Sequence, residues 1–301
     1  MHLQGDYALD RRRLKRRLTT WRVLAVVAAV IAVVAALAPM GYLISRPHLA
    51  RVAIEGVITE DRERDRALAD LADDSSVEAL VVHIDSPGGT VVGGETLYLR
   101  LRSIADRKPV VAVLGGLGTS AAYMTALGSD HIIARAGTIT GSIGVILQTA
   151  EVTDLLNDVG IKAETIKSGP LKAQPNPLEP LTPAAREAVE ASVMDIYEMF
   201  VAMVGERRSL DRSAVMSLAD GRVYTGRQAL DNGLIDEIGG EEEARAWLQR
   251  THDVGTFLPI RDVDLEGADR TLFDMLRTSV RKLFLSEILS LDGLVSVWHP
   301  K

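Results

Sequence analysis

A serine and a lysine stand in settings that could support nucleophilic catalysis. Ser120 follows a predicted strand and the turn Gly115-Gly116-Leu117-Gly118, so we expect it at the N-terminus of a helix. Backbone amides and the positive end of the helix dipole at such a position stabilise a developing oxyanion. Lys172 lies in the run Ser168-Gly169-Pro170-Leu171-Lys172-Ala173, and a lysine acts as a general base only where burial lowers the pKa of its ammonium group. The local pattern equally allows Ser120 to be a helix cap and Lys172 to be an ordinary loop lysine.

Nucleotide, metal and histidine-based sites have weaker support. The spacing Gly116-x-Gly118-x-x-Ala121 follows a strand and opens a helix, as a dinucleotide fingerprint does. The acidic residue expected about 20 positions later, at the end of a second strand, is missing, because Asp130 precedes its strand. The six histidines form no metal-binding motif and support no Ser-His-Asp triad. We therefore expect neither a cofactor nor a metal.

The composition indicates a folded chain and excludes several classes of protein. Its 301 residues are 47% apolar and 25% charged, which excludes a disordered or collagen-like chain. The formal charge is −7 although the first 22 residues are basic, so the rest of the chain is acidic and unsuited to nucleic acid. The chain has no cysteine, which excludes disulfides, thiolate catalysis and cysteine-based metal sites.

Residues 23–45 carry no charged residue and predict a transmembrane helix. At about 1.5 Å per residue this stretch is long enough to cross a hydrocarbon core of ~30 Å. Seven basic residues precede it and only Arg46 immediately follows it, so the positive-inside rule places residues 1–22 in the cytoplasm as a basic tail. The body of the chain would then lie on the outer side of the cytoplasmic membrane. The alternative is a cleaved signal peptide, since Ala36-Leu37-Ala38 resembles a cleavage site, but Pro39 would follow the cut.

Strands alternate with helices over the rest of the chain. This order predicts an α/β fold with parallel strands and right-handed crossovers over residues 46–265. Charges interrupt the apolar residues of 266–301, which predicts a C-terminal helical extension that packs against protein rather than crossing the membrane. The predicted strands cover residues 52–58, 79–84, 110–114, 132–134 and 144–146, and the predicted helices cover 91–106, 119–128 and 182–207.

Five motifs, in one order between residues 50 and 250, resemble the signal peptide peptidase A (SppA) and SohB family of membrane serine peptidases. The chain is similar to the short members of that family, which have a single module. The motifs are Asp85-Ser86-Pro87-Gly88-Gly89, Gly118-Thr119-Ser120-Ala121-Ala122-Tyr123, Gly137-x-Ile139-Thr140-Gly141-Ser142-Ile143-Gly144-Val145, Lys167-Ser168-Gly169-x-x-Lys172 and Gly221-Arg222-Val223-Tyr224-Thr225-Gly226-Arg227-Gln228-Ala229.

The resemblance implies a Ser–Lys dyad on a ClpP/crotonase-like fold with parallel sheets and flanking helices. Ser120 takes the position of the nucleophile, Lys172 that of the general base, and Ser142 that of a serine that supports the lysine by hydrogen bonding. The resemblance also implies that backbone amides hold the oxyanion, those of Gly88 or Gly89 together with that of Ala121.

One departure from the family pattern concerns the residues after the nucleophile. Ala121 and Ala122 stand where the family usually has two glycines, and their methyl groups restrict the backbone and narrow the adjacent pocket.

The resemblance further implies a membrane-anchored serine endopeptidase that degrades remnant signal peptides and other short or unfolded chains. Related short peptidases form homo-oligomeric rings in which the serine of one subunit meets the lysine of its neighbour. Two alternatives remain open from the sequence. One is a catalytically silent membrane scaffold of the same fold, and the other is a crotonase-like acyl-CoA enzyme.

Overall fold

The computed structural model describes residues 17–30, 46–263 and 295–297. The chain forms two units, Met1–Arg46 and Pro47–Lys301. In the first unit, residues 17–30 form a helix with exposed apolar side chains, among them Trp21 and Val26. Within the described part of the chain, no helix has both the length and the apolar character that a bilayer crossing requires. The predicted anchor, residues 23–45, falls partly outside the described residues and stays a prediction.

The second unit has the predicted alternation of strands and helices. Its strands are β1 (His48–Ile58), β2 (Val77–Thr90), β3 (Val110–Thr119), β4 (His131–Ala134), β5 (Ile139–Gly141), β6 (Val223–Thr225), β7 (Glu237–Ile238), β8 (Ile260–Asp262) and β9 (Val295–Val297). Its helices are α2 (Arg62–Asp73), α3 (Val91–Ala105), α4 (Ala121–Ala126), α5 (Thr153–Asp158), α6 (Pro183–Arg208), α7 (Arg212–Leu218), α8 (Gly226–Asp231) and α9 (Glu241–His252).

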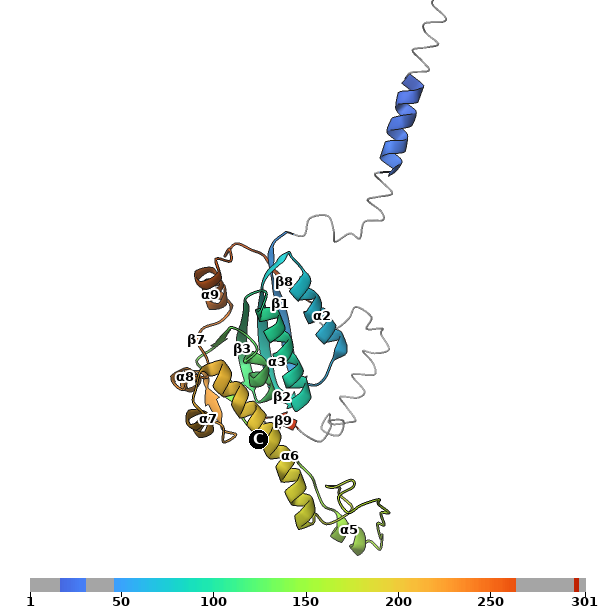
Figure 1. The fold of residues 1–301 in the computed structure, drawn as a ribbon, viewed down its shortest axis with the longest axis vertical. Helices are drawn as coiled ribbons and strands as arrows, with labels where there is room; N and C mark the ends of the chain where they lie inside the picture. The colour runs from blue at the N-terminus through green and yellow to red at the C-terminus, as the bar shows by residue number, and fades with distance from the viewer. Residues whose placement is uncertain (1–16, 31–45, 264–294, 298–301) are drawn as a thin grey trace, which may run out of the picture. The chain divides into compact units, whose positions relative to one another are not determined.

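The described strands form one mixed sheet (Figure 1). Its main order is β6-β5-β3-β2-β1-β8. Off this path, β4 pairs with β3, β7 pairs with β4, and β9 pairs with β2. The pairs β1–β2, β2–β3, β3–β4 and β3–β5 are parallel, which confirms the α/β prediction. The prediction of purely parallel pairing is wrong at two places, because β6 runs antiparallel to β5 and β9 antiparallel to β2. Both are three-residue strands, and antiparallel pairing needs no crossover helix against the sheet.

Several predicted boundaries differ from the structure. Strand β2 continues through the expected loop at residues 85–89, and β3 continues through the glycine-rich turn. The strand expected at residues 144–146 lies instead at Ile139–Gly141, where the chain pairs with β3. Helix α2 (Arg62–Asp73) lies between the first two strands and was not among the predicted helices. Its cap Asp61 accepts hydrogen bonds from two backbone amides, and its Leu68 and Leu71 are buried.

The predicted C-terminal helical extension lies mostly outside the described residues. Within it, Val295–Val297 form strand β9 rather than helix. The physical reason is local, because β-branched valines on either side of a serine favour extended backbone over helix.

Side chains of β2 alternate between two cores on opposite faces of the sheet. Leu80, Val82 and Ile84 are buried in a core with side chains of α2, α3, α4 and α6. Val81 belongs to a smaller core that includes Leu248 of α9. Alternation of this kind follows from the two-residue repeat of a strand. The sheet is therefore covered on both faces, as expected for strands this apolar.

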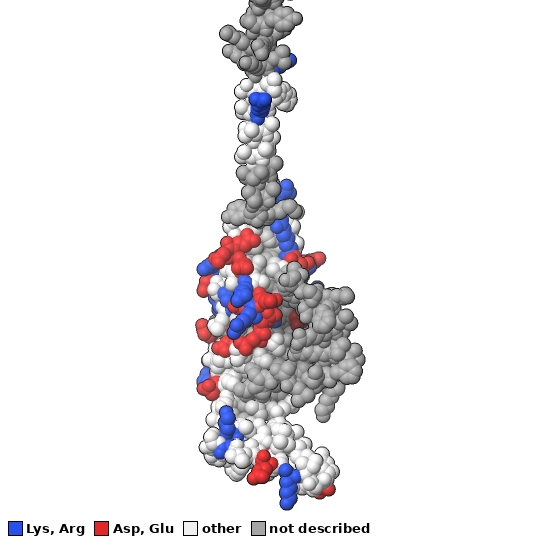
Figure 2. Space-filling view, turned by 90° about the vertical axis from the view of Figure 1, so that its right-hand side faces the viewer, with Lys and Arg blue, Asp and Glu red and all other residues white. Residues whose placement is uncertain are grey.

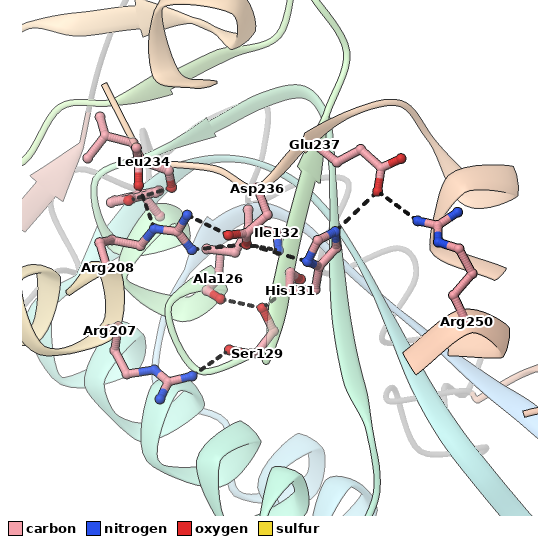
Figure 3. A network of polar contacts seen from close by, with 12 residues as sticks. Ala126, Ser129, His131, Ile132, Arg207, Arg208, Leu234, Asp236, Glu237 and Arg250 are labelled. Carbon is pink, nitrogen blue, oxygen red and sulfur yellow. Dashed lines mark hydrogen bonds and ion pairs between the residues drawn. The ribbon is translucent and has the colours of Figure 1, made fainter. Parts of the chain in front are cut away.

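Two arginines fix the C-terminal end of α6 to the sheet. Arg207 donates hydrogen bonds of 2.9 Å to the carbonyl oxygens of Leu127 and Ser129. Arg208 donates to both carboxylate oxygens of Asp236, at 2.7 and 3.0 Å (Figure 3). Burial alone would raise the pKa of Asp236, but the hydrogen bonds and charge of Arg208 lower it overall. One end of α6 is thus held firmly, while the other extends away from the sheet (Figure 1).

Candidate active site

Ser120 occupies a strained turn between β3 and α4. Its φ of 58° and ψ of −122° are unusual for a residue with a side chain, and such strain costs about 1–3 kcal/mol. It lies at the cap position of α4, yet its hydroxyl makes no capping hydrogen bond. The residue is 1% exposed. The side chain of Ser120 therefore does not cap α4, although the residue stands at a sharp strand-to-helix turn, the position that a nucleophilic serine takes in other folds.

Ser142 lies close to Ser120 because β5 pairs with the end of β3. Thr119 is the register partner of Gly141, and the Ser120 amide donates to the Gly141 carbonyl oxygen at 2.8 Å. Ser142 follows directly, is 8% exposed and has a positive φ of 50°. Its amide donates to the carbonyl oxygen of Arg222 at 2.8 Å. The structure thus brings the predicted nucleophile and the predicted supporting serine to the same edge of the sheet.

The segment from Ser86 to Thr90 forms the other side of the site. Thr119 Oγ1 donates to the Pro87 carbonyl oxygen at 3.0 Å, which ties this segment to the turn at Ser120. Position 89 accepts only glycine, because a Cβ there would lie 1.8 Å from the carbonyl oxygen of Ile58. The Gly88 amide donates to Ser86 Oγ at 3.1 Å. Gly88 can hold an oxyanion only after that hydrogen bond is exchanged.

Near Ser120, β3 no longer pairs with β2, and β9 pairs with that edge of β2 instead. One edge of β2 pairs with β1 as far as Gly89. The other pairs with β3 only as far as Ser86, because β3 then turns into α4. Residues 88–90 pair antiparallel with Val295–Val297. Since a strand has two edges and β1 takes one, β9 occupies the edge that β3 leaves.

The methyl groups of Ala121 and Ala122 point into the protein rather than into an open pocket. Both residues are fully buried, and Ala122 belongs to the larger core. Ala121 faces Gly94 of α3, where an added Cβ would lie 2.9 Å from the Ala121 Cβ. A glycine on the facing helix therefore makes room for the alanine that departs from the family pattern.

Tyr123 anchors α4 in the core through a hydrogen bond to Leu234. Its hydroxyl donates to the carbonyl oxygen of Leu234 at 2.8 Å, and burial raises the pKa of the phenol. A neutral, hydrogen-bonded tyrosine in the core holds the short helix in place.

Lys172 lies apart from this group. It belongs to residues 146–182, which we call the arm and which Figure 1 shows beyond the N-terminal end of α6. The Lys172 side chain is exposed, so the single chain does not supply the burial that a lysine base requires. The structure brings together Ser120, Ser142, Gly88, Gly89 and Ala121, but not Lys172.

Several contributors to the site were missed in the sequence. Ser86, Thr119 and Gly94 each support the backbone around the site, and the first two lie inside the five family motifs. Gly94 had only a weak signal, a glycine pair near the start of a helix. In the part of the chain that the structure describes, no cluster of histidine and acidic side chains is suited to a metal ion.

Comparisons with known proteins identify a peptidase family. Residues 102–255 match peptidase family S49. A provisionally named protease of Synechocystis sp. is 40% identical over 205 residues, which cover 67% of this chain and 74% of that protein. A provisionally named signal peptide peptidase SppA of Enterococcus faecium is 31% identical over 214 residues, 66% of this chain and 62% of that protein.

Among solved structures, a mutant of the membrane-bound stomatin-specific protease 1510-N is similar to this chain. It is 16% identical with a TM-score of 0.48, and the match covers 73% of this chain and 98% of that one.

Proposed function

The chain belongs to peptidase family S49 and is a serine peptidase, and on that premise we propose that Ser120 is its nucleophile and Lys172 its general base. The matches confirm the resemblance to the SppA and SohB family. The main support for Ser120 as the nucleophile is its strained conformation at the turn between β3 and α4. The residue is strained, buried and not used as a helix cap, and strain of this kind gathers at functional sites.

In the proposed reaction, Ser120 Oγ bonds to the scissile carbonyl carbon while its proton passes to the neutral Nζ of Lys172. The amides of Gly88 or Gly89 and of Ala121 hold the resulting oxyanion. Lys172 then returns the proton to the leaving amine, and the peptide bond breaks. A water oxygen then bonds to the acyl carbon while Lys172 accepts its proton, and as the bond from Ser120 Oγ to the acyl carbon breaks, Lys172 returns that proton to Oγ.

The substrate is an extended peptide that adds to β2 as an antiparallel strand. Support comes from β9, which pairs in this way with residues 88–90. Main-chain hydrogen bonds to a sheet edge give affinity with little demand on side chains. This mode suits remnant signal peptides and other short or unfolded chains, which are the substrates that we propose.

Lys172 reaches Ser120 from a neighbouring copy of the chain in a ring. Support comes from the arm, where seven apolar residues are at least two-fifths exposed. Figure 2 shows basic and acidic side chains scattered singly among uncharged ones toward this end of the second unit. A second copy would cover the apolar side chains and also remove Lys172 from water. The seven exposed apolar residues of the arm are Ile146, Leu155, Val159, Ile161, Ile166, Leu171 and Leu178.

We further propose a ClpP/crotonase-like architecture and a single-pass anchor at residues 23–45. The catalytic unit then lies on the outer side of the cytoplasmic membrane. The charge difference across residues 23–45 and the family resemblance support this topology.

Labelling with an acylating serine probe tests the proposed activity. The full chain in detergent should take up the probe and release peptides from an unfolded protein, whereas Ser120→Ala should do neither. Absence of both in the unsubstituted chain would favour the silent scaffold. Hydrolysis of an acyl-CoA thioester without peptide cleavage would favour the crotonase-like alternative.

A further inference from the structure

We propose that Lys167 and Glu179 are positioning residues whose ion pair holds the loop that presents Lys172. The inference rests on the proposed function, because it concerns the placement of the general base. The two residues are 12 positions apart and enclose Lys172 between them. No side chain of the pair is assigned a part in the proton transfers themselves.

The ion pair closes the loop at its two ends. Lys167 Nζ contacts Glu179 Oε2, and the two side chains are only 12% and 25% exposed. Gln174 Nε2 donates to the same carboxylate oxygen at 2.6 Å. The hydrogen bond from Lys167 holds the pKa of Glu179 below its ordinary value, so the carboxylate is charged at neutral pH. One oxygen of Glu179 thus joins two positions that flank Lys172 on either side.

Hydrogen bonds between residues close in sequence shape the backbone next to Lys172. The Lys172 amide donates to the Gly169 carbonyl oxygen at 3.1 Å. Asn176 Nδ2 donates to the Ala173 carbonyl oxygen at 2.8 Å, and Asn176 Oδ1 accepts from the Leu178 amide at 3.0 Å. These contacts set local turns, but each spans only two or three residues. The ion pair of Lys167 and Glu179 spans the whole loop, and Thr165 also hydrogen-bonds to Glu179 across it.

The closed loop and α6 line one pocket together. Leu171 and Gln174, on both sides of Lys172, line a pocket of about 290 Å³ together with Val189 and Ser192 of that helix. The far end of α6 is fixed to the sheet by Arg207 and Arg208. The position of Lys172 is therefore set through α6, provided that the loop stays closed.

Opening the loop should reduce the rate without weakening substrate binding. Removing one partner leaves the other charged group without its counterion in a partly buried position, which favours a loop that turns outward to water. Misplacement of a reacting group by about 1 Å lowers a rate about 100-fold. Substrate pairs with β2 through main-chain hydrogen bonds, in which neither Lys167 nor Glu179 takes part, so KM should change little.

The experiment measures kcat and KM of the full chain for an unfolded-peptide substrate. We expect Lys167→Met and Glu179→Gln to lower kcat about 10- to 100-fold with KM within about twofold. Lys167→Arg keeps the charge and should retain most of kcat. The matched control is Glu190→Gln, which removes an exposed ion pair with Arg186 near the start of α6 and should leave kcat unchanged.

Two results would overturn the proposal. The first is wild-type kcat in both Lys167→Met and Glu179→Gln. The second is equal loss in Lys167→Met and Lys167→Arg when both have the wild-type assembly mass and melting temperature. Lys172→Ala, assayed in parallel, separates this failure from failure of the proposed function, because an active Lys172→Ala would remove the lysine from the mechanism.

Discussion

Replacing Gly94 with alanine tests whether the packing of α3 on α4 holds the turn at Ser120. The added Cβ would lie 2.9 Å from the Ala121 Cβ and 3.2 Å from the Ala121 Cα and carbonyl oxygen. Carbon atoms in favourable contact are about 3.5–4.0 Å apart. The start of α4 must therefore move by several tenths of an ångström, and Ser120 is the residue directly before it.

The structure gives the size of the expected effect. Overpacking of a buried contact costs about 1–3 kcal/mol, whereas alanine is favoured over glycine inside a helix by about 1 kcal/mol. Gly94→Ala should therefore destabilise the fold by only about 0–2 kcal/mol. The rate should respond more strongly, because a shift approaching 1 Å at a reacting group costs about 100-fold. We expect kcat to fall about 10- to 100-fold.

The assay compares kcat with the melting temperature in three variants. Gly94→Ala/Ala121→Gly removes the opposing methyl group and should recover much of the lost kcat. Gly137→Ala is the control, because no atom lies within 4 Å of its added Cβ. Wild-type kcat in Gly94→Ala, or a double variant no more active than the single one, would refute the reasoning.

Three further predictions concern the base, the substrate edge and the acid side of the stability profile. Lys172→Arg should lose nearly all peptidase activity, because a guanidinium does not release its proton near neutral pH; substantial turnover would exclude Lys172 as the base. A chain lacking residues 295–301 has no β9 to occupy the edge of β2, so its KM for an unfolded peptide should fall. An unchanged or higher KM would contradict edge binding. The pKa of Asp236 is lowered in the fold, so its contribution to stability is present above about pH 4 and lost as pH falls. Asp236→Asn should lower the urea midpoint at pH 7, by a margin that shrinks in acid, and a margin independent of pH would contradict this.

Local sequence patterns predicted the parts of the site that local structure determines. Ser120 follows an apolar strand and precedes a run of small helix formers, and that order alone places a serine at a strand-to-helix turn. The alternation of β2 between two cores is also a local property, since it follows from the repeat of the strand. For these elements the expected α/β fold and the structure agree.

Contacts between distant residues were beyond the sequence patterns. Gly88–Thr90 pair with Val295–Val297, about two hundred positions later, and no periodicity indicates that partnership. The room that Gly94 leaves for Ala121 depends on how two helices pack. The arm places Lys172 in solvent although the motifs link it to Ser120. That exposure supports the arrangement that the family resemblance implies, in which the lysine comes from a second copy of the chain.

Mixing two inactive variants tests the shared site most directly. Ser120→Ala keeps its lysine and Lys172→Ala keeps its serine, so neither should cleave peptides alone. Ring interfaces join one subunit head-to-tail to the next, and random equal mixing should therefore restore about a quarter of the wild-type activity. Mixed assemblies confirmed by mass that remain fully inactive would contradict a dyad shared between neighbouring chains.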